Sequence, residues 1–221
     1  MRQPDHGVLA CALFDAIVDE PRGPREGFRL AVAHHDDGWR DRDAAPRSGD
    51  DDGPETFLEP ALAEHLEISG ASVRIAAELD PYAEALVALH GAWLHGARIV
   101  HDPEAAERRD AIVGEWRALA ERRADALGVA RADLHHDQRL CAMVDFVSLW
   151  LCGWPEGDEL ALERPDGDDA DVTRTGDVVR LPADLLPSAC TLEVPILCVA
   201  GAAPFPIVAE AVRRIDLHPA P

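Results

Sequence analysis

Apolar residues recur at helical spacing through most of the first 155 positions of the chain. In the segment 5–18, apolar residues from Leu9 to Ile17 follow one another at intervals of three and four, with His6 on the same face, which predicts an amphipathic helix. The same periodicity predicts further helices at 26–37, 60–75, 81–97, 103–127 and 133–154.

The segment 133–154 carries apolar residues on most of its sides, which is typical of a helix buried at the centre of a domain. Asp145 lies inside this apolar segment. A buried carboxylate is costly unless it is paired, hydrogen-bonded or bound to a metal. Asp145 is therefore either a metal ligand or an aspartate held by an arginine or a loop backbone.

The pattern changes after position 155. An acidic, glycine-rich stretch covers 156–171, short strands are predicted at 178–181 and 191–199, and a short helix is predicted at 205–215. Pro195 indicates an edge position or a break in the second strand. We therefore expect a mainly α protein, with a helical core at 1–155 and a small β-rich C-terminal extension at 156–221 packed on it.

The segment 41–60 is the longest predicted loop and is strongly acidic. Long loops inside compact domains are often functional. It carries Phe57 and Arg47 and directly follows a cluster of histidines and aspartates, so we expect it to form a lid or specificity element.

The chain has a formal net charge of −21, and its 21 basic residues are all arginine. A field this negative repels phosphate backbones, so nucleic-acid binding is not expected. The longest nearly apolar run, 140–154, is too short for a membrane span, and the first residues do not resemble a signal peptide. We expect a cytoplasmic protein without a membrane partner.

The residues best suited to chemistry form the run His34-His35-Asp36-Asp37-Gly38-Trp39. Imidazole nitrogens and carboxylate oxygens are ligands of divalent cations, and His6 and Asp145 could join His35 and Asp36 around one. Adjacent residues in a helix diverge by about 100°, so His35 and Asp36 can converge only near a helix end, where Gly38 would free the backbone.

The other histidines are less informative. His90 lies on an apolar helical face and is either a further ligand, a proton donor or a core histidine. His34, His95 and His101 are either substrate contacts or ordinary histidines. The pair His135-His136 is predicted to lie on a turn that faces solvent.

The order His6…His35-Asp36…Asp145 resembles the signature of the HD superfamily of metal-dependent phosphohydrolases. Trp39 stands where that motif commonly has a lysine. The chain resembles more closely an uncharacterised bacterial family of unknown function. The residues that carry this likeness are His35-Asp36-x-Gly38-Trp39, Pro46, Gly53-Pro54, Phe57, Asp80-Pro81-Tyr82, Leu89-His90-Gly91 and Asp145…Ser148-Leu149-x-Leu151-Cys152.

The superfamily resemblance implies an HD-like helical bundle with one or two divalent metal ions (Mn, Fe, Mg, Zn or Ni). It implies His6, His35, Asp36, Asp145 and His90 as ligands, and Asp36, Asp37 and His90 as groups that move protons.

The expected activity is hydrolysis of a small phosphorylated metabolite or nucleotide, with Arg47 and Arg139 neutralising the phosphate. The alternatives are a di-iron oxygenase, which needs about six protein ligands, and an inactive fold used for ligand binding or interaction. The expected partners are the small-molecule substrate and a second copy of the chain.

Overall fold

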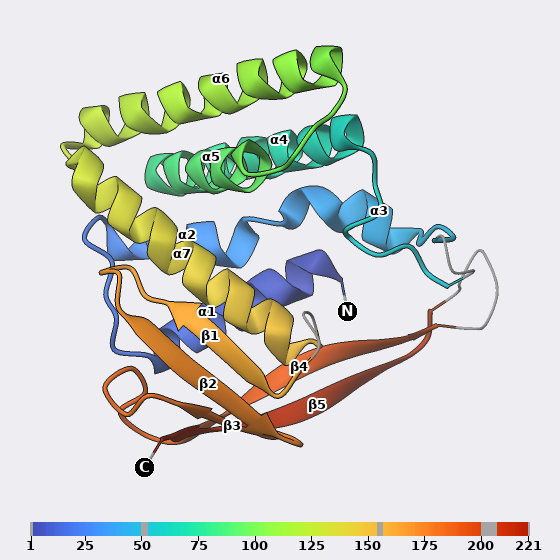
Figure 1. Ribbon diagram of the computed structural model, residues 1–221, viewed down its shortest axis with the longest axis vertical. Coiled ribbons are helices and arrows are strands. Elements are labelled where there is room, and N and C mark those ends of the chain that lie inside the picture. Colours follow the sequence, from blue (N-terminus) through green and yellow to red (C-terminus); the bar gives the residue numbers. More distant parts are fainter. Residues whose placement is uncertain (1, 50–52, 154–156, 200–206, 221) are drawn as a thin grey trace.

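A layer of helices lies above a single β-sheet in the computed structural model, which describes residues 2–49, 53–153, 157–199 and 207–220 (Figure 1). The helices are α1 (Gln3–Ala16), α2 (Arg25–His34), the 3-10 turn η1 (Asp37–Trp39), α3 (Arg40–Ala44), α4 (Leu62–Leu79), α5 (Pro81–Gly96), α6 (Pro103–Leu127) and α7 (Arg131–Leu151). The helices predicted before position 155 are thus all present, with bounds that differ by a few residues.

The sheet comprises β1 (Glu159–Glu163), β2 (Asp169–Thr175), β3 (Val178–Leu181), β4 (Cys190–Val199) and β5 (Ile207–Pro219), in the order β1-β2-β3-β5-β4. All neighbouring strands are antiparallel except β3 and β5, which are parallel. Pro195 lies in β4, which is an edge strand of the sheet, as predicted. The outer side of an edge strand has no neighbouring strand to accept a hydrogen bond, so a residue without an N–H is tolerated there.

One hydrophobic core joins the helices to the sheet. Side chains alternate along β1 and β2 between exposed and buried, so that Leu160, Leu162 and Val172 all lie on the inner face. That face packs against α7, which contacts β1, and α1, which contacts β4. The two helices that frame the sheet also carry His6 and Asp145, so the sheet fixes their relative position.

The prediction of a mainly α protein is wrong, because the C-terminal part forms a five-stranded mixed sheet. The stretch 156–171 contains β1, the turn at 164–168 and the first residues of β2. The segment predicted as a helix at 205–215 is strand β5 over its described part, from Ile207 onward. Strand β5 lies between β3 and β4, so its state is set by pairing with two other strands rather than by its own pattern.

The prediction of a solvent-facing turn at His135-His136 is also wrong. Both residues lie in the first turns of α7; His135 is exposed, but His136 is buried. The His136 ring contacts Asp137, which is fully buried.

Asp137 joins three separate segments. Its carboxylate accepts hydrogen bonds from the backbone N–H groups of Arg22 and Gly23, at 2.7 and 2.9 Å, and from the Tyr82 hydroxyl, at 2.6 Å. These contacts tie the α1–α2 connection and the start of α5 to α7. Burial and the Asp137 carboxylate together raise the pKa of Tyr82.

Replacing Asp137 by asparagine or alanine should therefore destabilise the fold without touching the cluster around Asp145. The alanine variant leaves two backbone donors and a hydroxyl buried without partners, so we expect a loss of at least about 3 kcal/mol in the free energy of unfolding. Tyr82→Phe removes a single bond and should cost about 1 kcal/mol. Urea denaturation checks both values; an Asp137→Ala protein as stable as Tyr82→Phe would contradict this role.

Candidate metal centre

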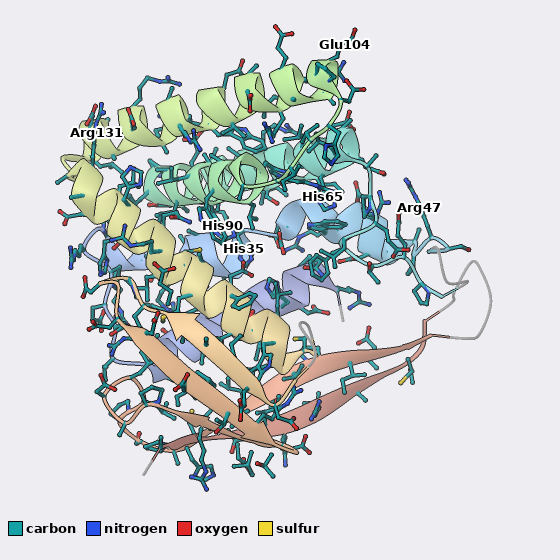
Figure 2. All side chains as sticks on the ribbon, in the orientation of Figure 1. His35, Arg47, His65, His90, Glu104 and Arg131 are labelled. Carbon is teal, nitrogen blue, oxygen red and sulfur yellow. The ribbon has the colours of Figure 1, made fainter. Side chains whose placement is uncertain are left out.

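Five side chains meet in the interior from four parts of the chain. His6 lies in α1, His35 and Asp36 directly follow α2, His90 lies in α5 and Asp145 lies in α7. The three imidazoles and Asp145 are buried, whereas the Asp36 side chain is 21% exposed. Figure 2 shows His35 and His90 pointing toward one another in the interior, between α2 and α5, and their ring centroids lie 5.3 Å apart.

The Asp145 carboxylate is the centre of this cluster. Its Oδ1 lies 2.6 Å from His6 Nε2 and 3.3 Å from His35 Nε2, and its Oδ2 lies 3.3 Å from His90 Nε2. Asp36 Oδ2 lies 3.5 Å from His6 Nδ1 and 3.7 Å from His35 Nε2. The donors form two overlapping groups, one of His6, His35 and Asp36 and one of His35, His90 and Asp145. Within each group the ligand atoms lie within 4.8 Å of one another.

Backbone carbonyls hold two of the rings with Nε2 directed inward. His35 Nδ1 lies 2.7 Å from the Val32 carbonyl, and His6 Nδ1 lies 3.3 Å from the Gln3 carbonyl. When each Nδ1–H donates to its carbonyl, the Nε2 lone pair is free to bind a cation. Metal-binding histidines are usually oriented in this way.

His90 gives independent support for a ligand at this place. His90 is 2% exposed, its Nδ1 has no hydrogen-bond partner among the described residues, and its Nε2 has only the 3.3 Å contact with Asp145 Oδ2, which lacks hydrogen-bond geometry. Buried polar groups rarely lack partners unless an ion, water or ligand supplies one. An ion between His90 and Asp145 could therefore be held by the free Nε2 of this ring.

The end of α2 explains how adjacent His35 and Asp36 both reach the cluster. The helix ends at His34, and Asp36 leaves the helical path with φ −110° and ψ 15°, as the sequence predicted. The sequence predicts that Gly38 ends the helix, but its role in the structure is different. Its N–H donates to Ser72 Oγ at 2.9 Å, and a Cβ built on it would lie 2.1 Å from the Ile68 carbonyl oxygen. Only glycine lets this segment lie so close to α4.

The pKa of each cluster residue depends on its burial and on the charges of the other residues. Burial lowers the pKa of His6 to about 4. Burial also opposes the charged forms of His35 and Asp145, but their mutual attraction outweighs it. The pKa of His35 is therefore raised, and the pKa of Asp145 is held well below its usual range. Burial raises the pKa of Asp36 to about 6. A cation here would replace the protons that these groups otherwise share.

A cavity of about 480 Å³ opens beside the cluster. His35, Asp36, His90 and Asp145 line one part of it. The other lining residues include Trp39, Phe57, Leu58, His65, Ser69, Trp93, Leu94, His95, Arg98, Phe146 and Leu149. An adjoining cavity of about 370 Å³ shares Trp39, Phe57 and Leu58 with it. The acidic loop thus borders both cavities through Phe57 and Leu58.

Three residues expected at the site have other surroundings. The Asp37 carboxylate contacts His34 Nδ1 and the Arg40 guanidinium, each at 2.8 Å, and Asp37 does not line the cavity. Arg47 pairs with Glu64 at 2.9 Å beside the adjoining cavity, and Figure 2 shows it at the periphery. Arg139 donates to the Pro165 carbonyl on another face. Neither arginine is placed to neutralise a group at the cluster.

His65 and Arg98 line the cavity although sequence reasoning did not select them. His65 shares the α4 face with Ser69 at a spacing of four, which was the only available signal. Arg98 follows the end of α5, and nothing in the local sequence distinguishes it from other surface arginines.

His95, which lines the same cavity as His65 and Arg98, should make the free energy of unfolding fall at acid pH. It is 4% exposed, its Nε2 lies 2.9 Å from Ser69 Oγ, and burial, with His65, Arg98 and His90 nearby, lowers its pKa from 6.5 to about 4. The unfolded chain therefore binds a proton between about pH 6.5 and 4 that the folded chain does not. Its contribution to stability is complete above pH 6.5 and is lost as the pH falls toward 4.

Replacing His95 by glutamine should flatten this dependence. The difference in unfolding free energy between pH 7.5 and 4.5 should shrink by about 2–3 kcal/mol relative to wild type. His101→Gln, at an exposed position a few residues on, should leave it unchanged. Urea denaturation at both pH values measures this, and equal pH dependence in wild type and His95→Gln would disprove it.

Comparisons with known proteins place the chain in a family. A family model described as "Protein of unknown function (DUF3891)" matches residues 1–182, so the chain belongs to this family. Neither the curated proteins nor the solved structures contain a match. The predicted membership of a family of unknown function is confirmed, whereas these findings do not link the chain to the HD superfamily. The matched range includes all five donors and ends after β3. None of the described helices is long and apolar enough to cross a membrane.

Proposed function

We propose that this DUF3891 chain is a metal-dependent phosphohydrolase that acts on a small phosphorylated metabolite or nucleotide. The observation that carries the proposal is the convergence of three imidazole Nε2 atoms on the buried Asp145 carboxylate, at the edge of a 480 Å³ cavity. Such a cluster is costly to bury without a cation. Several imidazole nitrogens and carboxylate oxygens face one another, and there are too few protons for each of them to form a hydrogen bond.

The donor set fits a divalent transition metal. Three imidazoles with two carboxylates suit Mn, Fe, Ni or Zn better than Mg, which prefers oxygen ligands. His6, His35, His90 and Asp145 would hold the ion from the protein side, and Asp36 would complete the set from the cavity side. The two oxygens of Asp145, which face different histidines, also allow a second ion.

A divalent ion at such a site lowers the pKa of a bound water toward ~7 and polarises a phosphoryl oxygen. The chain itself supplies position and proton transfer. Asp36 is the more exposed of the two carboxylates, with its side chain 21% exposed against 9% for Asp145. Asp36 would therefore orient the attacking water and accept its proton. Trp39, Phe57 and Leu149 line the adjacent cavity and exclude bulk water from the bond that breaks.

The resemblance of His6…His35-Asp36…Asp145 to the HD signature supports a hydrolase only at the level of these four residues. The sheet-containing fold gives it no support, so the proposal rests on the geometry of the site.

A di-iron oxygenase is the second candidate. The observation that favours it is the Asp145 carboxylate, whose Oδ1 lies near His6 and His35 and whose Oδ2 lies near His90, because a carboxylate with partners at both oxygens can bridge two adjacent ions. A sixth ligand would have to come from elsewhere. His65 Nε2 lines the same cavity and has no hydrogen-bond partner among the described residues.

Hydrolysis of p-nitrophenyl phosphate tests the first proposal. We expect the wild-type rate to vanish on chelation, to return with Mn²⁺, Fe²⁺, Ni²⁺ or Zn²⁺, and to fall by at least about 100-fold in Asp36→Ala. Asp41→Ala, an exposed acidic residue in the neighbouring helix, should keep the full rate. Equal residual rates in wild type and Asp36→Ala would refute the hydrolase. Bound iron with an oxygen-sensitive optical spectrum would favour the oxygenase instead.

A further inference from the structure

The arginines of this acidic chain are mostly paired with carboxylates. Within the described ranges, those with no carboxylate oxygen within 4.0 Å are Arg74, Arg98, Arg108, Arg117, Arg122, Arg139 and Arg180. All of these are exposed to solvent except Arg98, which is partly buried. A cation withdrawn from water without a counterion loses hydration that nothing replaces. Arg98 therefore differs from every other arginine in this group.

The backbone around Arg98 is fixed. Its N–H donates to the His95 carbonyl at 3.3 Å, and its own carbonyl accepts a hydrogen bond from the Arg109 guanidinium. The residue lines the same cavity as His35, Asp36, His90 and Asp145. Burial first, and then the charge of Arg98, lower the pKa of the neighbouring His65 to about 4. The imidazole next to Arg98 is thus neutral near pH 7 and does not compete with it for an anion.

The remainder of the cavity is mostly apolar. Phe57, Phe146 and Leu149 line it, and Trp93 and Leu94 lie at its boundary with 47% and 42% of their surface exposed. Large apolar side chains lining a concave surface are typical of small-molecule sites, where they contact the body of the ligand. Such walls suit a flat ring better than a sugar or a polyol.

We propose that Arg98 binds the phosphate of the substrate, and that the substrate is a phosphate monoester with an aromatic or similarly apolar leaving group. This inference rests on the proposed hydrolase and names its substrate class. Arg98 takes the role expected of Arg47 and Arg139, which face other surroundings. The guanidinium pairs with the phosphoryl oxygens, and the aromatic body lies against Trp93 and Phe146.

Equilibrium binding of phenyl phosphate and inorganic phosphate to chelator-treated and metal-loaded protein tests this inference. We expect phenyl phosphate to bind more tightly than inorganic phosphate. Arg98→Gln should weaken phenyl phosphate binding about tenfold or more in both forms, since a charge-assisted contact is lost. Arg98→Lys should recover part of it. Arg139→Gln and Arg47→Gln, which change charge equally, should bind as wild type.

Kinetics separate binding from a loss of structure. With phenyl phosphate as substrate, Arg98→Gln should raise KM more than it lowers kcat, with unchanged metal content and thermal midpoint. Unaltered phenyl phosphate affinity in Arg98→Gln, or equal affinity of wild type for phenyl phosphate and inorganic phosphate, would overturn the inference even if the protein is a hydrolase. Arg98-dependent binding without metal-dependent hydrolysis would instead uphold the ligand class and reject the proposed reaction.

Discussion

Replacing Asp145 by alanine is expected to abolish metal binding and hydrolysis together. Asp145 is the carboxylate that all three imidazole Nε2 atoms approach, at 2.6 to 3.3 Å. Without it the three rings lose the carboxylate that lies among them, and Asp36 remains near His6 and His35 alone. Loss of a residue that only hydrogen-bonds to a metal ligand lowers metal affinity roughly 10–100-fold. Loss of Asp145 should lower it by more. Hydrolysis should drop to the rate of chelated wild type.

Two comparisons make this result specific to the cluster. Asp145→Asn keeps the shape of the side chain but removes the charge, so it should lose most of the metal affinity while retaining more stability than the alanine variant. His135→Ala, an exposed residue on the same helix, should behave as wild type. Calorimetric titration with Mn²⁺ or Zn²⁺ measures each affinity. An Asp145→Ala protein that binds metal as wild type does would show that the cluster is not the site.

Replacing Gly38 by alanine is expected to have the second largest effect, although Gly38 contacts neither metal nor substrate. The added Cβ would lie 2.1 Å from the Ile68 carbonyl oxygen and 2.9 Å from the Ser72 backbone nitrogen. Backbone atoms cannot move aside as a flexible side chain can. Either α4 or the segment with His35 and Asp36 must shift. We expect a loss of about 3 kcal/mol in the free energy of unfolding and metal binding weakened at least about tenfold.

Gly114→Ala is the matched control for this substitution. Gly114 lies within α6, and a Cβ there meets no atom within 4 Å. Alanine is favoured over glycine in a helix, so this variant should gain about 0.5–1 kcal/mol of stability. Denaturation and metal titration of both variants measure the contrast. If Gly38→Ala matched Gly114→Ala in stability and metal binding, the close packing on α4 would not be what positions the motif.

Sequence patterns predicted the helical part of the fold well, because amphipathic helices record their buried face locally. The sheet was only partly predictable. The strand β5 pairs with β4, which directly precedes it, and with β3, which lies further back in the chain, and the local apolar pattern at 205–215 could not show that this pairing makes it a strand rather than a helix. In β1 and β2 the alternation is short and is masked by acidic residues on the solvent face.

The residues of the candidate site also divide into those that the sequence could select and those that it could not. His6, His35, Asp36, His90 and Asp145 could be selected because metal-binding residue types stood at unusual positions, above all a carboxylate in an apolar helix. Asp37 could not be separated from Asp36 by sequence, and its contacts with His34 and Arg40 became evident only in the structure. Arg98 carried no local signal, because its distinction depends on which carboxylates lie nearby in space.

Metal content of protein purified without a chelating tag, measured by mass spectrometry, tests the central claim most directly. The Asp36→Ala/Asp145→Ala double variant provides the comparison. We expect about one or two transition-metal ions per wild-type chain, as isolated or after reconstitution, and none in the double variant. Wild-type protein that holds no metal even after reconstitution would contradict the account and make the five-residue cluster a structural one.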